Sequence, residues 1–179
     1  MVAFEALEPG GSVVLTCACR PPSANNMTGK GRGRFGSELQ AAYTGASAPR
    51  LDGLLYGVVC WFVLGYRTGK DPDADNISKA VWDMLSDAQG GDAPGRVRLG
   101  AYKDDKDVRL RVSSIFDLRA EAAGAPGLDQ LNLTGVPDGV LVRLGKMVAG
   151  TSDDEHLTYI RFGRLHAGAY QFAFPEGVP

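Results

Sequence analysis

The stretch DGLLYGVVCWFVLGYR, residues 52–67, decides the fold of this chain because it is apolar on both of its faces. In an extended conformation, Val58 and Cys60 point to one side and Val59 and Trp61 point to the other. A strand with two apolar faces is covered on both sides. The stretch therefore predicts a central strand of a sheet, and it is too short and too rich in glycine to predict a membrane span.

The composition is that of one soluble domain. The chain has 179 residues, of which 44% are hydrophobic, and this is enough to bury a core. A formal net charge of −2 excludes both a strongly basic nucleic-acid binder and an acidic disordered chain. The first residues lack the pattern of a secretion signal, and three cysteines without a CxxC motif predict neither a disulfide framework nor a zinc site. We expect a cytoplasmic protein with Cys17 and Cys19 in its core.

Patterns on both sides of the central stretch predict an α/β (α+β) fold with a mixed β-sheet and few helices packed on it. Upstream, residues 12–19 predict a first strand, and residues 37–43 predict a short helix with Ser37 as its cap. Downstream, apolar residues from Ile77 onward recur at helical spacing, with Asp75 well placed as the cap. Gly90 and Gly91 would end this second helix.

The second half of the chain predicts more strands. Alternating apolar residues predict strands from about Asp107, over 139–148 and over 156–165. Residues 119–138 have the composition of an insertion, and the last ten residues that of a tail. We therefore expect a single domain over residues 1–179, with a core over about 12–148 and a C-terminal extension over 149–179 that carries extra strands.

Acidic residues crowd the stretch DPDADNISKA, residues 71–80, directly after the central strand. Asp73 and Asp75 project to the same side of an extended segment, and Asp105 precedes the later strand in a second acidic cluster. If the two clusters converge, these three carboxylates form an oxygen-rich site that suits Mg²⁺ or Mn²⁺. Lys79, one helical turn beyond Asp75, can reach the edge of such a site. These residue types fit metal-assisted phosphodiester hydrolysis.

A purely structural interpretation of the same residues is also open. Asp73 and Asp75 can serve as turn and cap residues, and Lys79 and Asp83 as an exposed pair on a helix. Asp104 and Asp105 can form a charged hairpin tip. His156 and His166 show no metal-binding pattern and are left outside the site. The spacing alone does not decide between the two interpretations.

Three landmarks together resemble a known family. The string DADNISKAVWDML, residues 73–85, resembles the D-x-D-N-x-x-K-A-x-x-D-x-L motif of the RusA family of Holliday-junction resolvases. DDKDV, residues 104–108, is similar to the later D-D-x-x-V element of that family. PPSANN followed by GKGRGR, residues 21–34 with two residues between, is similar to its P-P-S-x-N segment and basic loop. The landmarks occur in the order of the family.

The resemblance implies a RusA-like domain that acts as a metal-dependent endonuclease of bacterial or phage origin. Such a protein is a homodimer, and it resolves four-way DNA junctions by paired nicks in recombination and repair. Carried over residue by residue, the catalytic set is Asp73, Asp75, Lys79 and Asp105, the metal ligands are Asp73, Asp75 and Asp105, the supporting residues are Asn76 and Asp104, and the DNA-binding residues are Lys30, Arg32 and Arg34. The expected cofactor is Mg²⁺, with Mn²⁺ as a substitute.

Two other functions remain open at this point. The chain can be a DNA-binding or assembly protein that keeps the fold without cutting, or a nuclease for other branched DNA. The sequence contains no P-loop and no GxGxxG after a strand, so no nucleotide cofactor is expected. No membrane partner is expected either.

Overall fold

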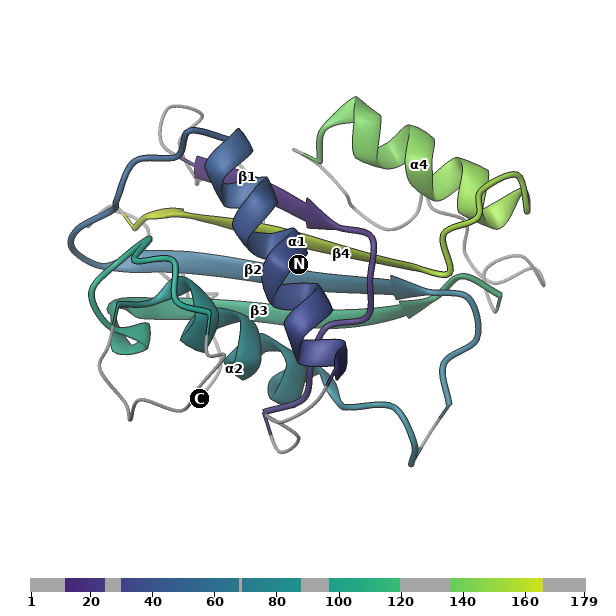
Figure 1. Cartoon of the computed structure of the whole chain (residues 1–179), viewed down its shortest axis with the longest axis horizontal. Helices are drawn as coiled ribbons and strands as arrows, with labels where there is room; N and C mark the ends of the chain where they lie inside the picture. Colours follow the sequence, from purple (N-terminus) through teal and green to yellow (C-terminus); the bar gives the residue numbers. More distant parts are fainter. Residues whose placement is uncertain (1–11, 25–29, 68, 88–96, 120–135, 166–179) are drawn as a thin grey trace, which may run out of the picture.

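The computed structural model describes residues 12–24, 30–67, 69–87, 97–119 and 136–165, with only the backbone of residues 30–32. In these residues the chain forms a single α/β domain, in which three helices pack on a four-stranded mixed sheet (Figure 1). The predicted fold class is confirmed.

The sheet is ordered β1-β4-β2-β3. Its strands are β1 (Ser12–Cys17), β2 (Leu55–Val63), β3 (Val108–Asp117) and β4 (His156–Arg164). β2 pairs with β3 in parallel, and β4 is antiparallel to both β1 and β2. Every residue of β2 is buried, which confirms the prediction of a central strand that is covered on both faces.

Helices cover both faces of the sheet. α1 (Lys30–Gly45) and α2 (Ala74–Leu85) pack on one face, where Phe35 and Trp82 join Val59 in one core cluster. α4 (Asp138–Val148) packs on the other face, where Leu144 and Phe62 belong to a second core cluster. The two apolar faces of β2 thus belong to different cores.

The segment over 139–148 is a helix and not the predicted strand. Val140, Leu144 and Met147 are its buried residues, at the spacing of one helical face. The same segment also alternates as a strand would, so its sequence supports both conformations. The segment is helical because the sheet buries the residues of the helical stripe.

The predicted strand over 156–165 is confirmed as β4, but its place differs from the expectation. β4 lies between β1 and β2 in the sheet, so this part of the expected extension belongs to the core. Most of the predicted insertion and the predicted tail lie outside the described residues.

The helix boundaries also need correction. α1 begins at Lys30, and the Ser37 hydroxyl donates to the Gly33 carbonyl inside this helix instead of capping it. The N-cap of α2 is Asp73 and not Asp75. α2 ends at Leu85, and the predicted stop at Gly90 and Gly91 lies outside the described residues.

The predicted core positions of Cys17 and Cys19 are confirmed. Cys17, Cys19 and Cys60 are buried free thiols, and burial raises the pKa of Cys17 and of Cys60 to about 12. Trp61 and Trp82 are fully buried. In the part of the chain that the structure describes, no helix is long and apolar enough to cross a membrane.

Candidate active site

Three strand ends meet at one edge of the sheet, which we call the carboxyl edge. Cys17, the last residue of β1, lies opposite Thr158, while Val63, the last residue of β2, lies beside both His156 and Asp117. β1, β2 and β3 all end here, and β4 begins here. Loops at the carboxyl ends of strands are frequent positions for functional side chains.

The segment after β1 contacts the start of α2 at this edge. The backbone N–H of Ala24 donates to the Asn76 carbonyl at 3.0 Å. The Thr158 hydroxyl donates to the Cys19 carbonyl at 3.0 Å, which holds the segment to the sheet. Two sequence landmarks, PPSANN and DADN, are therefore in direct contact although about 50 residues separate them in the chain.

The first turn of α2 presents the acidic pair to solvent. Asp73 caps the helix, because its Oδ1 accepts a hydrogen bond from the Asn76 N–H at 2.9 Å. Asp73, Asp75 and Lys79 are exposed, and Asn76 is partly buried. The positive end of the helix dipole favours carboxylates in this turn. Four of the predicted site residues thus lie together on one helix start.

Asp105 lies at the opposite edge of the sheet. It begins the short helical turn η2 (Asp105–Asp107), which leads directly into β3. Since β2 and β3 are parallel, Val108 lies beside Leu55 at the start of β2, far from Val63. α2 has 12 residues and spans about 18 Å from the carboxyl edge towards this opposite edge.

The predicted convergence of Asp73, Asp75 and Asp105 is therefore wrong for a single chain. The described residues contain no group of three or more His, Cys, Asp or Glu side chains that could hold a metal ion. Asp73 and Asp75 remain as two exposed carboxylates. The expectation that both project from one extended segment is wrong, because Asp75 lies in the first turn of α2 and Asp73 caps this helix. Exposed carboxylates can bind a divalent cation that takes its other ligands from water, substrate or another chain.

Asp104 and Asp105 have structural partners in their own turn. Asp104 Oδ1 accepts from the Lys106 N–H at 3.0 Å, and the Asp104 N–H donates to Asp107 at 3.1 Å. The hydrogen bond from Lys106 is the main reason why the pKa of Asp104 is lowered. The Asp105 carboxylate lies 3.4 Å from the Arg111 guanidinium, which also bonds the Asp105 carbonyl.

The predicted basic loop is the first part of α1. Lys30 and Arg32 belong to its first turn, and their side chains lie outside the described residues. Arg34 is exposed, and its Nε donates to Glu38 at 3.1 Å. The other oxygen of Glu38 accepts from the Ala18 N–H at 2.7 Å, which ties α1 to the end of β1.

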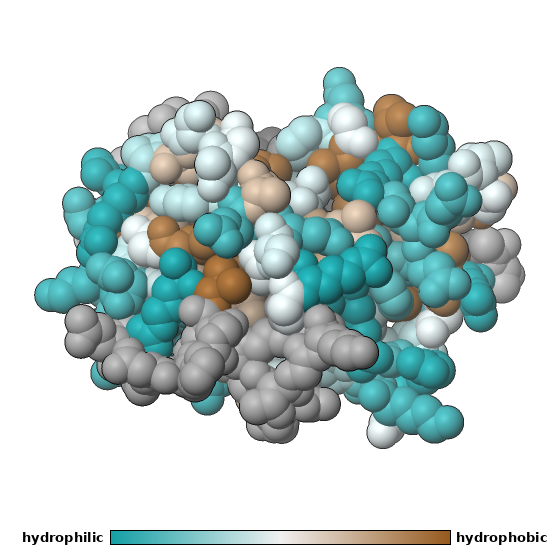
Figure 2. Space-filling view, in the orientation of Figure 1, coloured by the Kyte–Doolittle hydropathy of each residue, from teal (hydrophilic) through white to brown (hydrophobic). Residues whose placement is uncertain are grey.

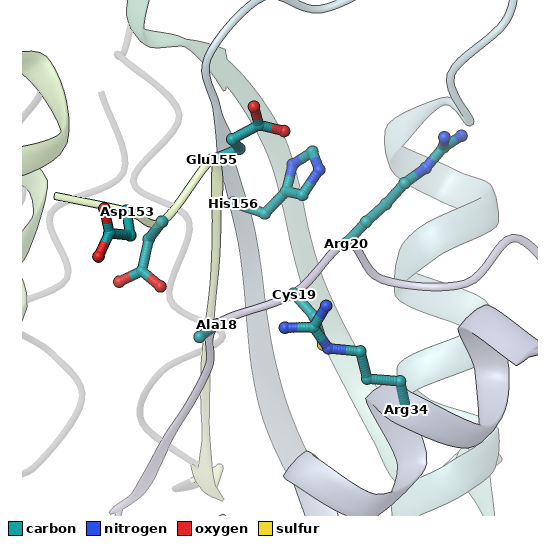
Figure 3. Close-up of a pocket in the computed structure, with 8 residues that line it drawn as sticks. Ala18, Cys19, Arg20, Arg34, Asp153, Glu155 and His156 are labelled. Atoms are coloured by element: carbon teal, nitrogen blue, oxygen red, sulfur yellow. The ribbon is translucent and has the colours of Figure 1, made fainter. Parts of the chain in front are cut away.

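A cavity of about 370 Å³ opens at the carboxyl edge (Figure 3). Its lining residues are Ala18, Cys19, Arg20, Arg34, Asp153, Asp154, Glu155 and His156. Asp154 is paired with Arg143 at 2.7 Å. Burial lowers the pKa of His156, whose ring centroid lies 5.7 Å from that of Trp61.

Sequence reasoning missed Arg20 as a neighbour of the acidic segment. Its guanidinium forms an ion pair with Asp71 at 3.1 Å and lies 5.8 Å from the centroid of the Trp61 ring. Arg20 directly precedes the PPSANN segment, and Asp71 begins the acidic stretch. Each residue of this ion pair lies next to a sequence landmark, and this position is the signal from which the pair could have been predicted.

The sequence matches no model of a known protein family, and it matches no curated protein sequence. The resemblance to the RusA family therefore stands on the motif residues alone.

Proposed function

We propose that this chain is a metal-dependent, structure-specific DNA endonuclease of the RusA-like class, which cuts four-way junctions. The observation that carries the proposal is the hydrogen bond between Ala24 and Asn76. It joins the PPSANN segment to the acidic helix start, so two landmarks of the resemblance are in contact. Arg34 lies on the same edge, where it can contact a DNA phosphate.

The exposed residues at the start of α2 have the chemistry that this reaction needs. Asp73 and Asp75 would hold the cation, since the N-cap and the first turn of α2 each carry an exposed carboxylate. Lys79 would stabilise negative charge on the phosphate that is attacked. Mg²⁺, when bound, supplies a Lewis acid and an activated water.

We further propose that Asp105 acts in the site of a second copy of the chain. β3 is an outermost strand of the sheet, and in the described residues no strand pairs with its outer side. A two-fold axis on the outer side of β3 would pair the β3 strands of two subunits in an antiparallel arrangement. Because β3 begins at the edge where Asp105 lies and ends at the carboxyl edge, this pairing would bring Asp105 of the partner subunit to the carboxyl edge of the first subunit.

The sequence of β3 is complementary to itself in one register. If the axis passes through Ser113, Leu110 lies opposite Phe116, and Arg109 lies opposite Asp117, whose carboxylate also accepts hydrogen bonds from the amides of its own chain. Opposite charges and apolar pairs in these positions stabilise antiparallel strands. Such a dimer would form two sites, one for each nick, and each site would combine Asp73 and Asp75 of one subunit with the partner subunit's Asp105.

Cleavage of a labelled four-way junction tests the proposal. We expect paired nicks in Mg²⁺, none in EDTA, and none on linear duplex. Cleavage of forks or flaps in preference to the junction would point instead to a nuclease for other branched DNA.

A second candidate function is DNA binding without cleavage. The separation of Asp105 from Asp75 within one chain favours it. Tight junction binding with no nicks in either Mg²⁺ or Mn²⁺ would support this second function and contradict the first.

A further inference from the structure

Asp71 is a carboxylate of the acidic stretch that the proposed reaction does not use. Its side chain is only 4% exposed, and it contacts Arg20 at 3.1 Å and Arg67 at 3.3 Å. The Arg67 N–H also donates to Asp71 Oδ2 at 2.7 Å. Burial alone would raise the pKa of Asp71, but the hydrogen bonds from Arg67 and the charge of Arg20 outweigh it and lower this pKa.

The two arginines hold Asp71 in different ways. Arg67 lies four residues before Asp71 in the same loop, and its side chain is 64% exposed. Arg20 comes from the segment after β1 and is 38% exposed, because its guanidinium lies over the Trp61 ring. Arg20 also donates to the Lys70 carbonyl at 3.4 Å. Of these two arginines, Arg20 is the one that joins Asp71 to a distant part of the chain.

The loop that Arg20 holds leads directly into the candidate site. Asp71 is two residues before the Asp73 cap, and the Tyr66 hydroxyl contacts the intervening Pro72 carbonyl at 3.5 Å. A shift of this loop would move the Asp73 carboxylate relative to the Asp75 carboxylate. A divalent cation tolerates little change in the distance between its ligands.

We propose that Arg20 is a positioning residue for the acidic pair and that it acts through Asp71. The inference rests on the proposed function, since the pair must bind a cation for its position to matter. The side chain of Arg67 forms an ion pair with the same carboxylate, but it contributes little to this positioning. It is exposed to solvent, and it belongs to the same loop as Asp71.

The test compares Arg20→Met with Arg67→Met, since both changes remove one guanidinium from Asp71. We expect Arg20→Met to raise the Mg²⁺ concentration for half-maximal junction cleavage about tenfold, with the rate recovering at high Mg²⁺. For Arg67→Met we expect a change of less than about twofold. A defect that only reduced the amount of folded protein would lower the rate at every Mg²⁺ concentration.

Hydrogen exchange provides a second readout that does not depend on activity. Arg20→Met should speed the exchange of the Asn76 amide, which Asp73 caps, and Arg67→Met should leave it nearly unchanged. If Arg20→Met fails to fold, Arg20→Lys replaces it in both measurements, because lysine keeps the charge but cannot bridge Asp71 and Lys70 from above Trp61.

Equal effects of the two arginine variants, or no effect of Arg20→Met on either readout, would overturn the inference. A wild-type protein that does not cut any DNA would overturn the proposed function. In that case the exchange of the Asn76 amide still decides whether Arg20 positions the loop.

Discussion

The two acidic segments of this chain, residues 71–76 and 104–107, look alike in sequence but differ in what their carboxylates contact. In the first segment, Asp71 is held by two arginines. Asp73 caps α2 through the Asn76 amide but is exposed, and Asp75 is exposed in the first turn. In the second, Asp104 and Asp107 bond to the backbone of their own turn. The comparison teaches that the contacts of a carboxylate, and not the number of acidic residues near it in the sequence, decide whether it is available to a cation.

The face of the molecule that carries α1 is mostly hydrophilic, with small separated apolar areas (Figure 2). A mostly polar face is typical of a surface that is in contact with water.

The largest effect is expected at Asp75. Asp75→Asn removes the charge of one of the two proposed cation ligands, and we expect junction cleavage to fall by about 100-fold or more. Asp138→Asn is the matched control, because Asp138 is an exposed aspartate in the first turn of α4. Cleavage that stays at the wild-type rate in Asp75→Asn would remove this residue from the site.

A smaller effect, on stability, should distinguish the second segment from the first. Asp104→Ala removes the cap of η2 and should lower the free energy of unfolding, measured in urea. Asp75→Ala, which removes no hydrogen bond of the Asp75 carboxylate among the described residues, should cost less than about 0.5 kcal/mol. Equal costs would contradict the assignment of a structural role to one segment and a ligand role to the other.

The smallest effect concerns pH. Because the pKa of Asp71 lies below its usual value of 3.8 in the folded protein, the unfolded chain takes up this proton first as the pH falls. The stability that Asp71 contributes is therefore present above pH 3.8 and is lost as the pH falls through the folded-state pKa. Unfolding in urea should depend less steeply on pH below this value in Asp71→Asn than in the wild type. An unchanged slope would show that the arginines do not stabilise the charged form.

The sheet could be predicted wherever the sequence allows only one burial pattern. β2 was predicted because residues on both of its faces are apolar, which excludes a surface position. α4 was missed because Val140, Val142 and Leu144 alternate like a strand, while Val140, Leu144 and Met147 follow a helical stripe. Only the tertiary contacts of the segment decide between the two patterns.

The local part of the candidate site could be predicted, but its assembly could not. The positions of Asp73, Asp75 and Lys79 at a helix start follow from their spacing. The position of Asp105 depends on whether β3 runs parallel to β2, because the residues before a parallel strand lie at the opposite edge from those after its neighbour. The sequence motifs do not show whether β2 and β3 pair in parallel.

Mixing two inactive variants tests the shared site most directly. Subunits that carry Asp75→Asn are combined with subunits that carry Asp105→Asn, for example by joint expression, and junction cleavage is compared with that of each variant alone. If Asp105 acts in the partner's site, each mixed dimer has one intact site, and about one quarter of all sites regain function as single nicks. No recovery above the separate variants, in mixed dimers of demonstrated composition, would contradict the shared site.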